Sequence, residues 1–206
     1  MSTDPPTTID RKVLRRELRN RRREIPAGQR MAAAESLSSR LLSLPFLPGR
    51  GDVAGYWAMD GEIALHAFQM RLPSGLRYCL PVLSGDRLRF APWNAGDPLA
   101  TNRYGIPEPE VAEDVMLEPA SMALVLVPLV GFDARGHRLG MGGGWYDRSF
   151  AFRNASHGSA RRPPWLVGAG FGLQQVDALD VQPWDVALDA VCSERDTILV
   201  DHPGNR

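Results

Sequence analysis

Residues 122–148 read MALVLVPLVGFDARGHRLGMGGGWYDR, and this stretch decides the fold. The run MALVLVPLV at 122–130 is the strongest apolar run of the chain. Its length and branched side chains are typical of a central strand that is covered on both faces. A loop follows, then four glycines within five positions (140, 142, 143 and 144), and we expect a helix to start near Trp145. Glycine loses more backbone entropy on folding than any other residue, so this concentration needs a reason.

The order of strand, glycine loop and helix start indicates a possible phosphate site. Backbone N–H groups of such a loop bind phosphate oxygens, and a helix N-terminus adds partial positive charge. Arg138 and Arg148 flank the loop and are candidates to complete the anion site. The spacing matches neither a Walker A motif, which requires a following Lys-Ser/Thr, nor a dinucleotide fingerprint. A glycine turn without a ligand is the alternative.

Two aspartates, Asp147 and Asp185, are candidate metal ligands. A carboxylate repels phosphate unless a cation lies between them, and Mg²⁺ is usually bound by one or two carboxylates together with substrate phosphates. Asp147 directly follows the glycine loop, and Asp185 arrives from the separate segment QPWDVALD. Turn capping is the alternative for either residue.

The rest of the chain predicts strands that alternate with helices. We expect helices over residues 9–24, 28–44 and 62–71, and strands over residues 52–58, 77–83, 87–93 and 165–171. Residues 94–120 are rich in proline, glycine and acids, which predicts a long surface excursion. The alternation predicts an α/β protein, a three-layer α/β/α arrangement with a mostly parallel central sheet. We expect one domain over residues 9–206, preceded by a loose tail at 1–8.

Composition and charge narrow the class of protein. The 206 residues are 44% apolar, enough for a buried core, and the formal net charge is zero. A zero net charge argues against a surface built for nucleic acid. Cys79 and Cys192 lack the spacing of metal ligands. No apolar run approaches the roughly 20 residues of a membrane span, and the N-terminus lacks the apolar region of a signal peptide. We therefore expect a soluble, cytoplasmic protein without a membrane partner.

The first predicted helix carries seven arginines between residues 11 and 23. A solvated charged face is the usual explanation for such a run. At 100° per residue the helix has one narrow apolar stripe, formed by Leu14, Leu18 and Ile25. Arg11, Arg15 and Arg22 border this stripe, so Arg11 and Arg15 are candidates for the edge of a cleft. RNA binding is another alternative, but no aromatic residues, which would stack on bases, interleave with the arginines.

Taken together, these segments resemble the 5-formyltetrahydrofolate cyclo-ligase family, also called methenyltetrahydrofolate synthetases. The likeness runs from about residue 11 to residue 200 and keeps the family's order of motifs. Its most specific block, VPxxxFDxxGxRLGxGxGYYDR, is present as VPLVGFDARGHRLGMGGGWYDR at 127–148. The other blocks are the basic helix with Arg11 and Arg15, YWAMDGEI with Trp57 and Glu62, RYGIPEP with Tyr104, and Gln174 followed by WDVALDAVCSE.

The resemblance implies an ATP- and Mg²⁺-dependent ring closure. It would convert 5-formyltetrahydrofolate to 5,10-methenyltetrahydrofolate and release ADP and phosphate. ATP would phosphorylate the formyl oxygen, which is otherwise a poor leaving group, and the neighbouring folate nitrogen would attack the activated carbon. In such a transfer the protein mainly positions the reactants and stabilises charge. We expect a monomer that acts on small molecules and binds no nucleic acid.

The resemblance also assigns roles to individual residues. Arg138, Gly140 and Tyr146 are expected to be catalytic, and Asp147 and Asp185 to bind Mg²⁺. The ATP-binding residues would be Arg11, Arg15, Arg138, Leu139, Gly140, Met141, Gly142, Gly143, Gly144, Trp145 and Tyr146. The folate-binding residues would be Trp57, Glu62, Tyr104, Met141, Gly142, Gly143, Gly144 and Trp145, with Glu62 accepting hydrogen bonds from the pterin. Core packing is the alternative for the aromatic residues, above all for Tyr56.

Three positions depart from the family pattern. Arg11 replaces a lysine, which keeps the charge but brings a larger planar head group. Trp145 replaces the first tyrosine of YYD, and Trp184 replaces the histidine before the second acid. Both carboxylates and the glycine loop are retained, so we expect an active cyclo-ligase. A homologue that binds folate or nucleotide without turnover is the alternative.

Overall fold

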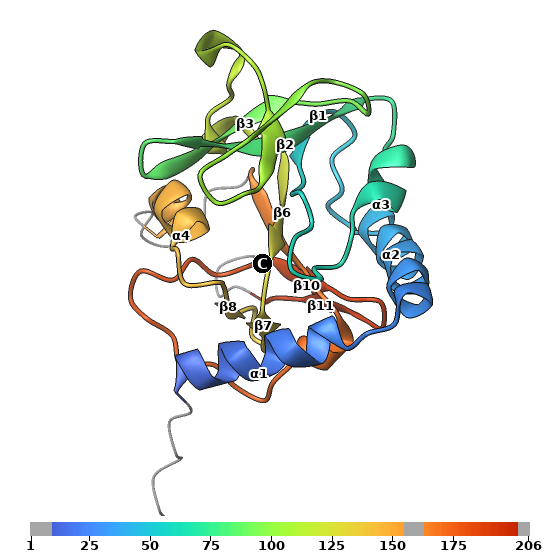
Figure 1. Ribbon diagram of the computed structural model, residues 1–206, viewed down its shortest axis with the longest axis vertical. Coiled ribbons are helices and arrows are strands. Elements are labelled where there is room, and N and C mark those ends of the chain that lie inside the picture. The colour runs from blue at the N-terminus through green and yellow to red at the C-terminus, as the bar shows by residue number, and fades with distance from the viewer. Residues whose placement is uncertain (1–9, 155–162, 202–206) are drawn as a thin grey trace, which may run out of the picture.

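The computed structural model describes residues 10–154 and 163–201 and contains a seven-stranded sheet (Figure 1). The predicted tail at 1–8 lies outside the described residues. The sheet has the order β11-β10-β9-β6-β1-β2-β3. Neighbouring strands are parallel from β10 to β2, and the edge strands β3 and β11 are antiparallel to their neighbours. The predicted α/β class and mostly parallel sheet are therefore confirmed.

The bounds of the elements are as follows. The sheet strands are β1 (Gly51–Ala54), β2 (Leu76–Ser84), β3 (Arg87–Pro92), β6 (Leu124–Pro128), β9 (Trp165–Ala169), β10 (Ala190–Cys192) and β11 (Thr197–Leu199). Two small hairpins pair β4 (Leu99–Thr101) with β5 (Pro107–Pro109), and β7 (Gly131–Phe132) with β8 (Arg138–Leu139). The α-helices are α1 (Arg11–Arg23), α2 (Ala27–Leu42), α3 (His66–Met70) and α4 (Trp145–Ser149). The 3₁₀ turns are η1 (Glu113–Val115), η2 (Pro119–Ser121), η3 (Ala151–Arg153) and η4 (Gly172–Gln174).

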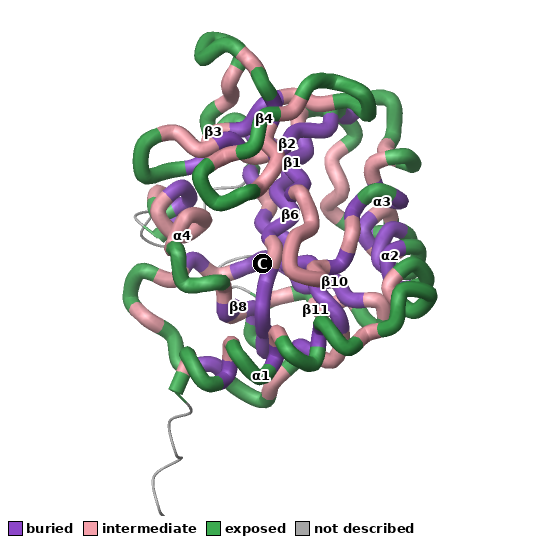
Figure 2. Tube along the Cα trace, viewed as in Figure 1, coloured by how far each residue is buried: buried purple, intermediate pink, exposed green. Residues whose placement is uncertain are grey.

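Strand β6 is covered on both faces, as its apolar sequence predicts. Leu124 and Leu126 join the core with α2 and α3, whereas Val125 and Val127 join the opposite core with Phe150. Figure 1 shows α2 and α3 on one side of the sheet and α4 on the other, and Figure 2 shows the central strands as buried. The third layer is thin in the part of the chain that the structure describes, because there it consists of α4, η3 and irregular segments rather than long helices.

Helix α1 lies beyond the carboxyl end of β6 (Figure 1). The Asp10 side chain caps its start by accepting from the Lys12 N–H at 2.7 Å. Leu14 and Leu18 are buried against Val130 and Leu139. The third buried residue of the helix is Arg22, not the predicted Ile25, which follows the end of the helix and is only partly buried.

Two predicted elements are shorter than expected. The strand predicted at 52–58 ends at Ala54, and the helix predicted at 62–71 is confined to His66–Met70. Asp60 and Gly61 between them have φ angles of 51° and 75°, which no right-handed helix contains. The excursion at 94–120 is also more ordered than predicted, since it forms the β4–β5 hairpin and pairs Leu117 with Phe90 of β3.

The connections create a switch point between β1 and β6. From β1 the chain passes through α3 to β2 on one side, whereas from β6 it continues to β9 on the other side. Adjacent parallel strands whose connections leave in opposite directions open a crevice at their carboxyl ends, and ligands of open α/β sheets bind there. No helix within residues 10–154 and 163–201 is long and apolar enough to cross a membrane.

Candidate active site

A cavity of about 890 Å³ occupies the switch point. Residues that follow β1, such as Tyr56 and Trp57, and residues at the end of β6, Pro128 and Leu129, form part of its wall. Helix α1, the glycine loop with α4, the β4–β5 hairpin, strands β2 and β3, and the segment at 182–185 also contribute to the wall. Except for Leu139, every residue to which the family resemblance assigned a role lines this cavity: Arg11, Arg15, Trp57, Glu62, Tyr104, Arg138, Gly140, Met141, Gly142, Gly143, Gly144, Trp145, Tyr146, Asp147 and Asp185.

Leu139 is the exception among the assigned residues. Its side chain is fully buried in the small core between α1 and the β7–β8 hairpin. The Leu139 side chain therefore holds β8 against α1. Arg138 is the other residue of β8, and the glycine loop follows this strand.

The glycine loop runs from the end of β8 to the start of α4. Gly142 and Gly144 have φ angles of 96° and 66°, a conformation that side chains disfavour. Gly140 differs, because a Cβ added there would meet no protein atom within 4 Å. The protein itself therefore does not require glycine at 140, and the absence of a side chain leaves space on the cavity side. Helix α4 has only five residues, so its dipole contributes less than predicted.

Three arginines bring positive charge to the cavity. The Arg15 Nε donates to the carbonyl oxygen of Gly140 at 2.8 Å and so ties α1 to the loop. Burial and the neighbouring Arg11 lower the pKa of Arg15, and burial likewise lowers the pKa of Arg138. Arg148 was predicted to complete the anion site, but it does not line the cavity. Its side chain donates to the carbonyls of Asp86 and Gly143, and its guanidinium carbon lies 5.1 Å from the centroid of the Trp145 ring.

The two candidate metal ligands line the same cavity, and each is held by an arginine. Asp147 accepts from Arg138 and, at 3.1 Å, from the N–H of Val186. Asp185 accepts from Arg11 at 3.0 Å and from the N–H of Gln182 at 3.0 Å. No cluster of three or more His, Cys, Asp or Glu able to hold a metal occurs in residues 10–154 and 163–201. Two carboxylate groups are hard oxygen ligands that fit Mg²⁺ shared with phosphate oxygens, and do not fit an all-protein metal cage.

Aromatic residues form part of the cavity wall. Tyr104 is presented at the tip of the β4–β5 hairpin by Asn102, whose side-chain oxygen accepts from the N–H groups of Tyr104 and Ile106 at 2.9 and 3.1 Å. The Tyr104 ring meets Trp145 edge to face at 6.0 Å. Tyr146 lies deeper, and burial raises its pKa far above the usual range, so its hydroxyl stays protonated at neutral pH.

Tyr56 and Trp57 differ in role. The Tyr56 hydroxyl donates to the carbonyl of Ile63 at 2.8 Å and is buried, which supports the structural alternative for this residue. Trp57 is only partly buried and packs edge to face on Trp93 at 5.8 Å. Trp57 therefore retains exposed ring surface for a planar ligand.

Glu62 lies in a tight turn rather than at the start of a helix. Its Oε2 accepts from the Met59 N–H at 3.0 Å, and its Oε1 lies 4.0 Å from Arg22. Burial raises the pKa of Glu62, while the Met59 N–H and the charge of Arg22 act in the opposite direction. The side chain is 12% exposed, so the carboxylate reaches the cavity from a mostly apolar wall.

Several lining residues were not predicted from the sequence. They are Met59, Asp60, Pro81, Leu83, Leu88, Asn102, Ile106, Pro128, Leu129, Gln182 and Trp184. For Asn102 and Ile106 a signal existed, because both flank the assigned Tyr104. For the apolar residues of β2 and β3 no local signal exists, since only the tertiary fold turns them toward the cavity.

The switch-point cavity has an open glycine loop, arginines and paired carboxylates beside exposed aromatic rings. These features define an α/β enzyme site that suits a phosphorylated ligand together with a planar one. A family model specifies the class further: residues 7–194 match the model of the 5-formyltetrahydrofolate cyclo-ligase family. The chain belongs to this family, and the resemblance inferred from its motifs is confirmed.

Curated relatives agree with this assignment. The chain is 33% identical over 186 residues to the 5-formyltetrahydrofolate cyclo-ligase of Haemophilus influenzae, covering 88% of this chain and 96% of the relative. It is 33% identical over 178 residues to that of Escherichia coli, covering 84% of this chain and 94% of the relative. The solved structure of Aquifex aeolicus 5,10-methenyltetrahydrofolate synthetase superposes with a TM-score of 0.76 at 25% identity, covering 95% and 98% of the two chains.

Proposed function

We propose that this protein converts 5-formyltetrahydrofolate to 5,10-methenyltetrahydrofolate, consuming ATP and releasing ADP and phosphate. The observation that carries the proposal is the single cavity that brings Glu62 and Trp57 together with Arg138, Asp147 and the glycine loop. Family membership supports the same reaction, because close relatives bear the name of this activity.

Arg11, Arg15 and Arg138 would hold the polyphosphate of ATP. Their three guanidinium groups offer paired N–H donors suited to phosphate oxygens. The unobstructed main chain at Gly140 would approach the transferred phosphoryl group, and no side chain would intervene. In phosphoryl transfer such positioning and charge stabilisation supply most of the catalysis.

Asp147 and Asp185, which both line the cavity, would hold Mg²⁺. The metal, when bound, neutralises charge on the phosphates during transfer. Binding would exchange the present contacts of each carboxylate with an arginine for contacts with the cation. Arg11 and Arg138, which contact these carboxylates in the structure, also line the cavity and would be placed to bind phosphate.

The folate would occupy the aromatic part of the cavity. Trp57, Tyr104 and Trp145 offer ring surfaces for its planar system, and the Glu62 carboxylate accepts hydrogen bonds from pterin N–H groups. The formyl oxygen then attacks the terminal phosphorus and ADP leaves. The neighbouring folate nitrogen attacks the activated carbon, loses its proton, and the C–O bond breaks with departure of phosphate.

The test is the absorbance of the methenyl product, measured while ATP is added last to protein, 5-formyltetrahydrofolate and Mg²⁺. A rise that starts only with ATP supports the proposal, and a flat trace from folded protein contradicts it. The second candidate is a binder without turnover, favoured by the exposed Trp184 where the family has histidine. Tight binding of folate or nucleotide without ADP release would support that candidate.

RNA binding through α1 is less well supported by the geometry. Arg19, Arg22 and Arg23 all bind the carboxylate of Asp60. Much of the basic charge of the helix is therefore already paired, which reduces the charge left for a phosphate backbone.

A further inference from the structure

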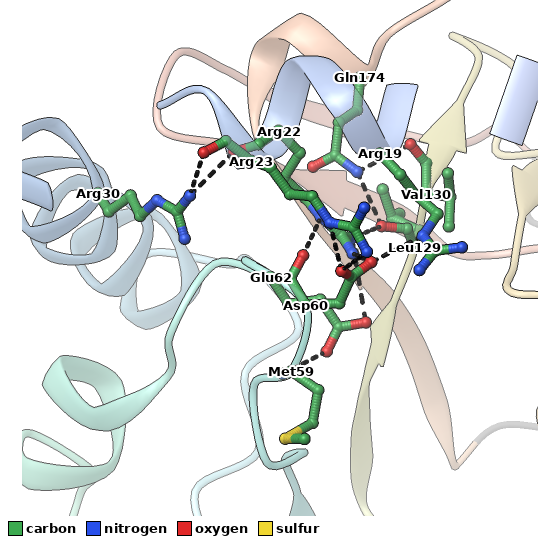
Figure 3. Close-up of polar contacts among 10 residues, drawn as sticks. All are labelled: Arg19, Arg22, Arg23, Arg30, Met59, Asp60, Glu62, Leu129, Val130 and Gln174. Atoms are coloured by element: carbon green, nitrogen blue, oxygen red, sulfur yellow. Dashed lines mark hydrogen bonds and ion pairs between the residues drawn. The ribbon is translucent and has the colours of Figure 1, made fainter. Parts of the chain in front are cut away.

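Arg22 is a buried charge that lies beside the cavity but not in its lining. Its side chain is fully buried on the inner face of α1. A buried charge is strongly destabilising unless it is paired and hydrogen-bonded, so the partners of Arg22 must be specific. Figure 3 shows that they come from the segment after β1 and from the segment after β6.

One guanidinium group joins both walls of the switch point. The Arg22 Nε donates to the carbonyl of Asp60 at 3.1 Å, and the Nη2 donates to the Asp60 carboxylate at 3.1 Å. The Nη1 donates to the carbonyl of Leu129 at 3.3 Å and lies 4.0 Å from the Oε1 of Glu62. Lysine has a single donor nitrogen and cannot reproduce this set of contacts.

Gln174 holds the same carbonyl from the other side (Figure 3). Its Nε2 donates to the carbonyls of Leu129 and Val130, both at 2.8 Å, and its Oε1 accepts from the N–H of Phe171 at 2.8 Å. Gln174 is buried and does not line the cavity. Gln174 therefore holds in place the Leu129 carbonyl that accepts a hydrogen bond from Arg22.

The turn that carries Glu62 is unfavourable without these contacts. Asp60 has a φ angle of 51°, which is rare for a residue with a side chain. Arg19 and Arg23 bind the Asp60 carboxylate together with Arg22 and so hold it in this conformation. The turn is closed by the N–H of Glu62, which donates to the Met59 carbonyl at 2.9 Å. One oxygen of Glu62 is then fixed by Met59, and the other faces Arg22.

We propose that Arg22 is a positioning residue for the reaction: it orients the Glu62 carboxylate and keeps it charged for the folate, with Gln174 anchoring the Leu129 carbonyl that holds Arg22 in place. The inference rests on the proposed function, which makes Glu62 the acceptor for the pterin. It does not assign Arg22 any contact with substrate, because Arg22 is absent from the cavity wall.

The charged and titratable groups around Glu62 come from several elements. They are Arg22 and Arg19 of α1, Asp60 of the same turn, Tyr56 after β1 and Tyr146 of α4. Burial keeps both tyrosines neutral by raising their pKa values. Burial and the negative charge of Asp60 both raise the pKa of Glu62. Among the cations, Arg22 acts most strongly in the opposite direction.

The experiment compares two variants. Arg22→Gln removes the charge, whereas Arg22→Lys keeps the charge but replaces the planar guanidinium group with a single donor nitrogen. Affinity for 5-formyltetrahydrofolate is measured by quenching of tryptophan fluorescence, and the KM values for folate and ATP are measured across pH. Arg21→Gln is the matched control, because Arg21 is an exposed arginine of the same helix that pairs with Glu17 rather than with Asp60 or Glu62.

We expect both Arg22 variants to weaken folate binding at least about tenfold, the usual effect of losing hydrogen bonds of a charged group. The KM for ATP should change less than about twofold, since the phosphate contacts are separate. Without the cation, the pKa of Glu62 rises further. As the pH is lowered, Arg22→Gln should therefore lose its folate affinity at a higher pH than wild type does. Arg22→Lys should keep the wild-type pH profile at its weakened affinity, and Arg21→Gln should match wild type in both affinity and pH profile.

Wild-type folate affinity and pH profile in folded Arg22→Gln would overturn the inference while leaving the proposed function intact. Equal weakening for folate and ATP, with no shift of the pH profile, would reduce Arg22 to a structural role. If wild type itself binds no folate, both proposals fail. If neither Arg22 variant folds, Gln174→Met decides: a rise in folate KM alone supports the inference, and unchanged folate KM contradicts it.

Discussion

Arg15 and Gly140 join the first helix to the glycine loop, although 125 positions separate them in the sequence. The Arg15 Nε donates to the Gly140 carbonyl at 2.8 Å, and both residues line the cavity. The bond turns the carbonyl of Gly140 toward α1. It also places a guanidinium group at the loop expected to approach phosphate.

Replacing Arg15 by Ala should therefore weaken ATP binding more than folate binding. We expect the KM for ATP to rise about tenfold or more, the usual effect of losing hydrogen bonds from a charged group. Arg16→Ala is the matched control, because Arg16 is the neighbouring arginine on α1, exposed and outside the cavity wall. Steady-state kinetics with each substrate varied in turn give the answer. Equal effects of the two variants would mean that general charge, not Arg15 itself, binds ATP.

Gly140→Ala tests the effect of a side chain at this position on ATP affinity separately from its effect on stability. The site has room for a Cβ within the protein, so the free energy of unfolding should change by no more than about 0.5 kcal/mol. ATP affinity should nevertheless fall, because the new methyl group occupies space on the cavity side. Gly49→Ala, at an equally open position outside the cavity wall, should change neither property. Wild-type ATP affinity in Gly140→Ala would show that no phosphate approaches the loop at this point.

Asp147→Asn and Asp185→Asn test the metal site. Each removes one negative charge from the proposed Mg²⁺ site, and we expect turnover to fall about a hundredfold or more, in line with several kcal/mol of transition-state stabilisation by a metal. The activity that remains should require more Mg²⁺. Asp180→Asn is the control, since only the main-chain carbonyl of Asp180 binds Arg11. Titration of activity with Mg²⁺ is the measurement, and an unchanged Mg²⁺ requirement would place the metal elsewhere.

We expect Glu62→Gln to bind folate less tightly than wild type and to be more stable at neutral and higher pH. The folded state raises the pKa of Glu62 above its unfolded value, mainly through burial, so ionised Glu62 destabilises the fold at neutral and higher pH. This penalty disappears as pH falls below the unfolded pKa of glutamate. The variant should therefore have a higher Tm than wild type at pH 8, a difference that shrinks toward pH 4, and a folate KM raised about tenfold or more.

The matching control for stability is Glu110→Gln, at an exposed position outside the cavity wall. Its Tm should follow that of wild type at every pH. A Glu62→Gln variant that is less stable than wild type at pH 8 would mean that the carboxylate mainly serves to close its turn through Met59.

The sequence predicted the central features of the fold because their signals are local. The branched apolar run at 122–130 allows little besides a covered strand, and the glycines after it mark the loop. The leucines at 14 and 18 give the first helix its apolar stripe, and Pro26 follows its end, whereas the cap at Asp10 was not predicted, since the helix was expected to begin at residue 9. The site residues predicted from these signals lie on elements that line one cavity.

What was mispredicted depends on tertiary contacts. The residues around Glu62 were predicted as a helix, because nothing local reveals that three arginines of α1 hold Asp60 at a positive φ. Arg22 was placed beside the buried stripe, since its charge argues against burial until its partners on two other segments are known. The strands of the β7–β8 hairpin are two residues long, too short for a periodic pattern.

The measurement that tests the central claim most directly follows ADP and the methenyl chromophore in the same sample. Protein, 5-formyltetrahydrofolate and Mg²⁺ are mixed, ATP is added last, and both products are quantified over time. We expect no chromophore before ATP, and afterwards one ADP for each methenyltetrahydrofolate formed. ADP without chromophore, chromophore without ATP, or neither product from folded protein would contradict the account.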